Sequence, residues 1–89
     1  MNAAIDTAHM CSHLQRKLMD EGGCYHRLWI ALQRDPGVTA VVRSRQLHIY
    51  RNGKKVLVLK GRAAPQVVRQ DPLAALLPPE LQSRAKRDD

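Results

Sequence analysis

Residues 38–61, VTAVVRSRQLHIYRNGKKVLVLKG, alternate apolar and polar side chains around two sites suited to tight turns. Asn52-Gly53 is the strongest short signal for a β-hairpin, because both central residues of a type I′ turn need a positive φ and these two residue types tolerate it. Ser44-Arg45 is interpreted as a second turn of two residues. The stretch therefore predicts a three-stranded antiparallel β-meander.

The two turns also predict the register of the strands, since a turn of fixed length decides which residues lie opposite each other. Ile49 is expected to face Val56 on one side and Ala40 on the other, and Leu47 to face Val58 and Val42. One face of the sheet then collects aliphatic side chains: Val38, Ala40, Val42, Leu47, Ile49, Val56 and Val58. The other face is predicted to be half apolar and half basic, with Thr39, Val41, Arg43, His48, Tyr50, Lys55, Leu57 and Leu59.

Apolar residues recur at helical spacing in two segments before the sheet. The first segment, residues 4–20, ends at Gly22-Gly23, and the second, residues 24–34, ends at Asp35-Pro36-Gly37. Because the chain has one Trp and no Phe, Trp29 is expected to be the largest side chain in the core. The apolar faces of the two segments consist of Met10, Leu14, Leu18, Tyr25, Leu28, Trp29 and Leu32.

Asp71-Pro72 is a typical helix start, and Pro78-Pro79 ends the short apolar segment that follows it. The sequence thus predicts an α+β fold in which an N-terminal helical hairpin packs on the three-stranded meander, followed by a short C-terminal helix and a disordered tail. A single domain is expected over residues 1–81, with a flexible charged tail over residues 82–89. The sequence leaves open whether residues 71–81 cover the second face of the sheet.

The cysteine count and the apolar pattern bear on location. Cys11 and Cys24 are too few for a disulfide framework, and no apolar stretch of about 18 residues is present. The N-terminus also lacks a basic start followed by an apolar run. A cytoplasmic protein with free thiols and no membrane partner is therefore expected.

The chain is strongly basic, with 15 Lys and Arg, 8 Asp and Glu, a formal charge of +7 and a pI near 10.1. Such a balance favours anionic partners, either nucleic acid or an acidic protein. The basic residues gather in the predicted sheet and its turns, which favours a small non-enzymatic accessory or regulatory protein that binds DNA or RNA. Phosphate contacts are predicted for Arg43, Arg45, Arg51, Lys54, Lys55 and Arg62, and base contacts for His48 and Tyr50.

Another function fits the mixed face of the sheet. Apolar groups beside charges are common in protein interfaces, and open strand edges permit strand addition. An inhibitor or adaptor of the kind carried on phages and plasmids would use Val41, Tyr50, Leu57 and Leu59 against an acidic protein. Homodimerisation through this face is compatible with either function. Basic residues at the edges of a sheet also prevent aggregation, and this role requires no ligand.

Catalysis and metal binding find less support. His9 and His13 lie four residues apart on a helix, and Cys24 and His26 follow the Gly-Gly turn, but their spacing matches no familiar zinc knuckle. The carboxylates lie at element ends and in turns, and no Gly-rich phosphate loop is present. No catalytic residue, metal ion or cofactor is therefore assigned, and no enzyme is expected.

A resemblance to a known family offers a third function. The order of two helices and three antiparallel strands, with LHIYRNGKKVLVLKGR at residues 47–62, resembles the RelE-type ribonuclease toxins. This resemblance implies cleavage of RNA. The chain departs from the family in lacking the strand before the helices and a catalytic His or Tyr after the sheet, so no residue role is transferred.

Overall fold

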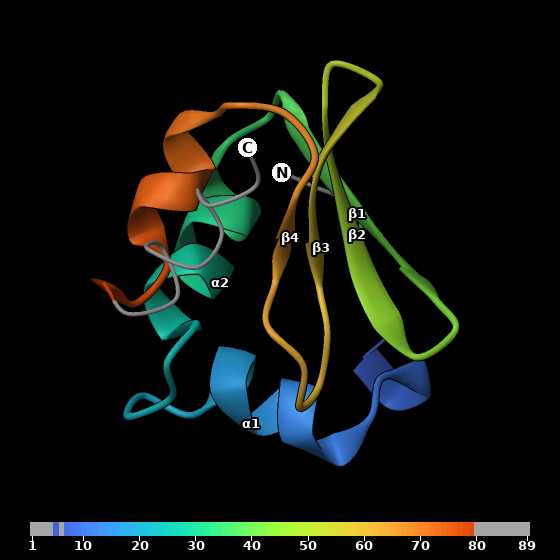
Figure 1. Cartoon of the computed structure of the whole chain (residues 1–89), viewed down its shortest axis with the longest axis vertical. Coiled ribbons are helices and arrows are strands. Elements are labelled where there is room, and N and C mark those ends of the chain that lie inside the picture. The colour runs from blue at the N-terminus through green and yellow to red at the C-terminus, as the bar shows by residue number, and fades with distance from the viewer. Residues whose placement is uncertain (1–4, 6, 80–89) are drawn as a thin grey trace.

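The computed structural model describes residue 5 and residues 7–79 of the chain. Its sheet has the order β1-β2-β3-β4, with α2 and η2 on one side of it and α1 across one end (Figure 1). The α+β arrangement predicted from the sequence is confirmed. The predicted tail, residues 82–89, lies outside the described residues. The elements are η1 (Thr7–His9), α1 (Ser12–Met19), α2 (His26–Arg34), β1 (Val38–Arg43), β2 (Gln46–Arg51), β3 (Lys54–Leu59), β4 (Gln66–Val67) and η2 (Pro72–Leu76).

Both predicted turns are present and have the expected backbone conformation. The φ angles are 50° and 63° at Ser44 and Arg45, and 52° and 85° at Asn52 and Gly53. These positive values are those of type I′ turns, whose twist matches the twist of the strands that they join. The register of β1 against β2 is also confirmed, with Val42 opposite Leu47 and Ala40 opposite Ile49.

The predicted register of β2 against β3 is wrong beyond the first two pairs. Tyr50 lies opposite Lys55 as the turn requires, but the register then shifts, so that Ile49 lies opposite Leu57 and not Val56. The extra residue, Val56, belongs to a β-bulge, and its carbonyl oxygen accepts hydrogen bonds from the backbone N–H groups of Val68 at 2.8 Å and Arg69 at 3.3 Å. Leu57 and Leu59 consequently lie on the helix-facing side of the sheet, where both are fully buried, and Val58 lies opposite His48 on the other side.

A fourth strand extends the predicted three-stranded meander. β4 contributes only two residues, and it pairs antiparallel with β3 through Gln66 opposite Val58 and Val67 opposite Leu57. Two residues are too short for an alternating pattern to be visible in a sequence. β4 affects the register of β3, because the N–H groups of the two residues directly after β4 donate hydrogen bonds to the bulged residue of β3.

The helical hairpin packs against the sheet through the aliphatic side chains expected from its spacing. Its turn is tight, since a Cβ atom on Gly23 would clash with the backbone carbonyl groups of Arg16 and Lys17. Tyr25 and not Trp29 is the large aromatic residue of the core: Tyr25 is fully buried, whereas Trp29 is half-buried at its edge. Burial, with a smaller contribution from Cys24, raises the pKa of Tyr25 to about 12.

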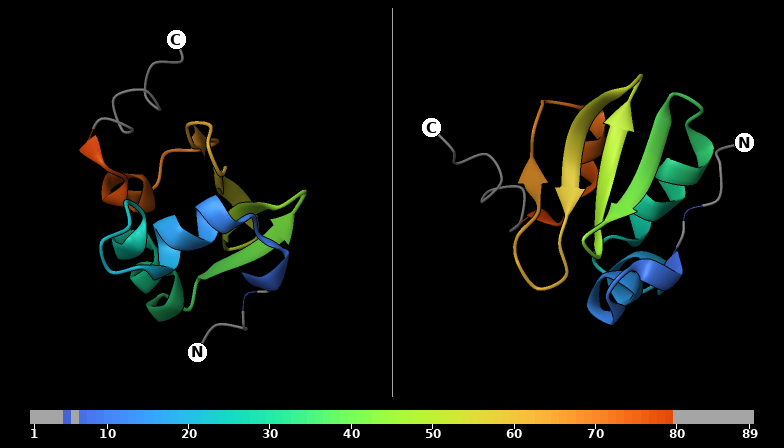
Figure 2. Two further views of the ribbon diagram at one scale, coloured as in Figure 1. Left: turned by 90° about the horizontal axis from the view of Figure 1, so that it is seen from below. Right: turned by 90° about the vertical axis from the view of Figure 1, so that its right-hand side faces the viewer.

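The short C-terminal helix, η2, lies on the same side of the sheet as α2. The carboxylate of Asp71 accepts a hydrogen bond from the N–H of Leu73 at 2.9 Å, as expected of an N-cap, and Leu73 and Leu77 are buried in the common core. Figure 2, right, shows the sheet in front of α2 and η2. Residues 71–79 therefore leave the second face of the sheet uncovered.

Candidate nucleic-acid interface

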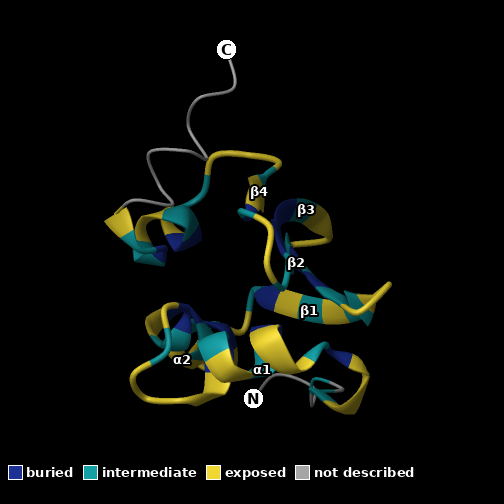
Figure 3. Ribbon diagram, turned by 60° about the horizontal axis from the view of Figure 1, so that its bottom comes forward, coloured by how far each residue is buried: buried dark blue, intermediate teal, exposed yellow. Residues whose placement is uncertain are grey.

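The outer face of the sheet, meaning the side away from α2 and η2, is exposed or half-exposed apart from the buried Val58, and its strands lack acidic residues. Strand β1 alternates between inward residues and exposed outward ones, as the burial colours show (Figure 3). None of the four strands contains Asp or Glu. The outer face consists of Thr39, Val41, Arg43, Gln46, His48, Tyr50, Lys55, Val58 and Gln66.

His48 lies at the centre of this face between two cations. Burial lowers the pKa of His48, and the positive charges of Lys55 and Arg43 lower it further. The buried Nδ1 atom of His48 has no hydrogen-bond partner among the described residues. At neutral pH the imidazole is therefore uncharged, and it offers a neutral planar surface beside two positive groups.

Tyr50 is the second planar side chain on the outer face. It follows His48 by two positions on the central strand β2, so the two rings project from the same side and their Cα atoms lie roughly 7 Å apart. Tyr50 lies opposite Thr39 on one side and Lys55 on the other, and it is half-buried. Such spaced rings suit stacking with bases, because every base has a π-face.

The six cations predicted to contact phosphate do not lie together. Arg43 and Lys55 belong to the outer face, whereas Lys54 lies opposite Arg51 and projects from the other side of the sheet. Arg45 is exposed in the turn between β1 and β2, and Arg62 is exposed after β3. The outer face thus gathers two of the six, with Arg45 and Arg62 near the end of the sheet opposite Asn52-Gly53.

Arg51, also predicted to contact phosphate, is held by two carboxylates of its own chain. Its Nε atom donates to Asp71 Oδ1 at 2.6 Å, its Nη2 atom to Asp71 Oδ2 at 3.2 Å and its Nη1 atom to Asp35 Oδ2 at 3.0 Å. These hydrogen bonds, first those with Asp71, raise the pKa of Arg51. We call Arg51, Asp35 and Asp71 the Arg51 clamp. The clamp corrects the prediction, because a guanidinium with two carboxylate partners is a poor phosphate ligand.

The Arg51 clamp should make the fold sensitive to acid. The N–H of Gly37 and then Arg51 hold the pKa of Asp35 below its ordinary value of 3.8. Burial opposes ionisation of Asp71, but hydrogen bonds from Arg51 and from the N–H of Leu73 outweigh it, so its pKa is also lowered. A carboxylate whose pKa is lower in the folded chain than in the unfolded chain stabilises the fold when it is ionised. This stabilisation is full above the unfolded-chain pKa of about 4, and it is lost as the pH falls through the lower pKa values of the folded chain.

Asp71→Asn tests this stabilisation, since Asn can still cap η2 but carries no charge. At pH 7 the variant should lose about 1 to 2 kcal/mol of the free energy of unfolding, the usual effect of losing a charged hydrogen bond. The difference from the wild type should shrink by pH 3, because the wild-type carboxyl is then being protonated. Urea unfolding at both pH values measures this, and an equal difference at both would contradict the assignment.

The four residues predicted to contact an acidic partner protein do not lie together on one exposed face. The bulge moves Leu57 and Leu59 into the core, where neither has exposed surface. Val41, with 41% of its surface exposed, and Tyr50 remain on the outer face. This face is accordingly more polar than the expected register implied.

The histidines and cysteines do not converge. Over the described residues, no three His, Cys, Asp or Glu side chains lie close enough to hold a metal ion. The Nδ1–H of His26 donates to the carbonyl oxygen of Leu18 at 3.0 Å, and Cys11 and Cys24 are free thiols. None of the helices in the part of the chain that the structure describes is long and apolar enough to cross a membrane.

Comparison with protein-family models gives no match, and neither does comparison with curated proteins or with solved structures. The resemblance to RelE-type toxins gains no support from these comparisons. The chemistry of the outer face is therefore the basis on which a function is proposed.

Proposed function

We propose that the protein binds single-stranded nucleic acid across the outer face of its sheet, as a small non-enzymatic accessory or regulatory protein of the cytoplasm. The observation that carries the proposal is the placement of Arg43 and Lys55 beside His48 and Tyr50 on an open face whose strands contain no acidic residue. Cations beside planar side chains are the combination that proteins use for single strands.

Each side chain has a distinct role in this proposal. Arg43 on β1 and Lys55 on β3 contact phosphates on either side of the central strand, and Arg45 and Arg62 extend the positive path at one end of the sheet. Tyr50 and the uncharged His48 stack with two successive bases. Stacking and phosphate contacts do not involve the hydrogen-bonding edges of the bases. Binding is therefore expected to depend little on the nucleotide sequence.

A single strand fits better than a duplex for two reasons. The bases of a duplex are stacked on each other and are not available to Tyr50 and His48. A two-stranded β-ribbon that enters a major groove needs positive side chains at its tip. At this tip, Arg51 is already paired with Asp35 and Asp71. DNA and RNA both satisfy the chemistry of this face.

A salt titration tests the proposal. A fluorescent ten-residue oligo(U) or oligo(dT) should bind at low salt, and its affinity should fall by about tenfold or more between 50 and 200 mM salt, as expected when a few phosphates are neutralised. A blunt duplex of the same length should bind more weakly. Absence of binding at low salt, measured by fluorescence anisotropy, would remove the proposal.

A further inference from the structure

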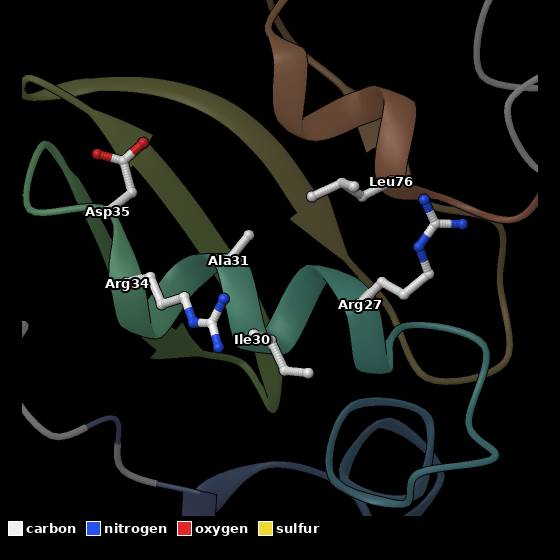
Figure 4. A pocket seen from close by; sticks show the side chains of 6 residues that line it. All are labelled: Arg27, Ile30, Ala31, Arg34, Asp35 and Leu76. Atoms are coloured by element: carbon white, nitrogen blue, oxygen red, sulfur yellow. The ribbon is translucent and has the colours of Figure 1, made fainter.

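A groove lies between α2 and η2, on the opposite side of the molecule from the outer face. It is open to solvent, encloses about 470 Å³ and has a mostly apolar surface. Figure 4 shows α2 on one side of it and Leu76 of η2 on the other. Its lining residues are Arg27, Ile30, Ala31, Arg34, Asp35 and Leu76.

The Arg51 clamp holds the two walls of this groove in place. Asp35 is the C-cap of α2 and Asp71 is the N-cap of η2. Arg51 of β2 binds both carboxylates and so ties the end of one wall to the start of the other. The groove is therefore formed before any partner arrives, which reduces the entropy lost on binding.

The groove carries positive charge that its own acidic residue does not neutralise. Arg27 and Arg34 are exposed, are seven residues apart on α2, and have no ion pair with any described residue. Two helical turns separate them, a rise of about 10.5 Å along the axis. The carboxylate of Asp35 is already engaged by the N–H of Gly37 at 3.0 Å and by Arg51.

An apolar patch lies between the two guanidinium groups. Ile30 has 36% of its surface exposed, and Ala31 and Leu76 complete the patch. Guanidinium groups bind carboxylates in a bidentate manner, so a complementary ligand presents two carboxylates with an apolar side chain between them.

We propose that this groove binds an acidic amphipathic helix of a partner protein. The helix carries two Glu or Asp residues about two turns apart, which pair with Arg27 and Arg34, and a Leu-like side chain between them, which packs on Ile30 and Leu76. The mode is that of a helix laid in a groove, with its apolar residue as the anchor. This inference does not depend on nucleic-acid binding, because it uses the opposite side of the molecule.

A pair of synthetic peptides tests the inference. The probe is a labelled helical peptide with Glu at two positions seven residues apart and Leu between them, and the control peptide has Gln at both Glu positions. The Glu peptide should bind the full-length protein at low salt at least tenfold more tightly than the Gln peptide, as measured by anisotropy. It should also change the fluorescence of Trp29, the chain's single tryptophan, which is adjacent to Ile30.

Matched variants locate the binding. Arg27→Gln with Arg34→Gln should weaken binding of the Glu peptide at least tenfold, whereas Arg16→Gln with Arg69→Gln, which removes the same charge from other exposed positions, should not. Circular dichroism checks that both variants fold. Failure of the Glu peptide to bind, equal binding of both peptides, equal losses in both variants, or displacement of the peptide by an oligonucleotide would each overturn the inference.

Discussion

Reversal of charge at Arg43 and Lys55 together, as Arg43→Glu with Lys55→Glu, is expected to weaken the binding of a single-stranded oligonucleotide by about 100-fold at low salt. A hydrogen bond to a charged group contributes about 1.5 kcal/mol or more, so two lost phosphate contacts amount to about 3 kcal/mol, or two decades in Kd. The slope of affinity against salt concentration should also become shallower, since fewer counterions are released.

The double variant is expected to keep its fold, so that the loss reports on binding. Arg43 is exposed, Lys55 is half-exposed, and neither is in an ion pair within the described chain. Thermal unfolding should therefore stay close to that of the wild type. An oligonucleotide affinity within threefold of the wild-type value, in a folded variant, would show that these two residues do not contact phosphate.

Leu57→Ala is expected to lower the free energy of unfolding by about 3 kcal/mol, the usual effect of truncating a buried leucine. The side chain is fully buried because the bulge at Val56 turns it toward the helices. Val41→Ala is the matched control, since Val41 is exposed on the outer face, and its effect should stay within about 0.5 kcal/mol. Urea unfolding measures both, and a loss below 1 kcal/mol for Leu57→Ala would contradict the bulged register.

The sequence was sufficient to predict β1, β2 and their register, because alternation and turn chemistry agree there. It was insufficient for β3, where Val56, Leu57, Val58 and Leu59 are consecutive aliphatic residues and all four are buried. Without alternation, the sequence contains no signal for which of them face the helices. The bulge at Val56, which sets the direction of these side chains, is held by hydrogen bonds from the two residues after β4. These hydrogen bonds link positions twelve or more residues apart in the sequence.

The same distinction between local and distant signals explains the candidate sites. Alternation alone places Arg43, His48, Tyr50 and Lys55 on one face. The loss of Arg51 to Asp35 and Asp71 could not be predicted, because these partners are 16 and 20 residues away in sequence. The groove is absent from the sequence prediction, which places every binding residue on the sheet, in its turns or directly after it. A local signal for it does exist in Arg27, Ile30 and Arg34, which share one exposed side of α2.

The proposed function requires that the outer face, and not the overall positive charge, binds nucleic acid. Its most direct test is the oligonucleotide Kd of Arg43→Glu with Lys55→Glu against that of Arg27→Glu with Lys54→Glu, which changes the net charge equally but lies away from the outer face. We expect about 100-fold weaker binding for the first variant and a loss of less than about tenfold for the second. Equal losses in the two variants would contradict it.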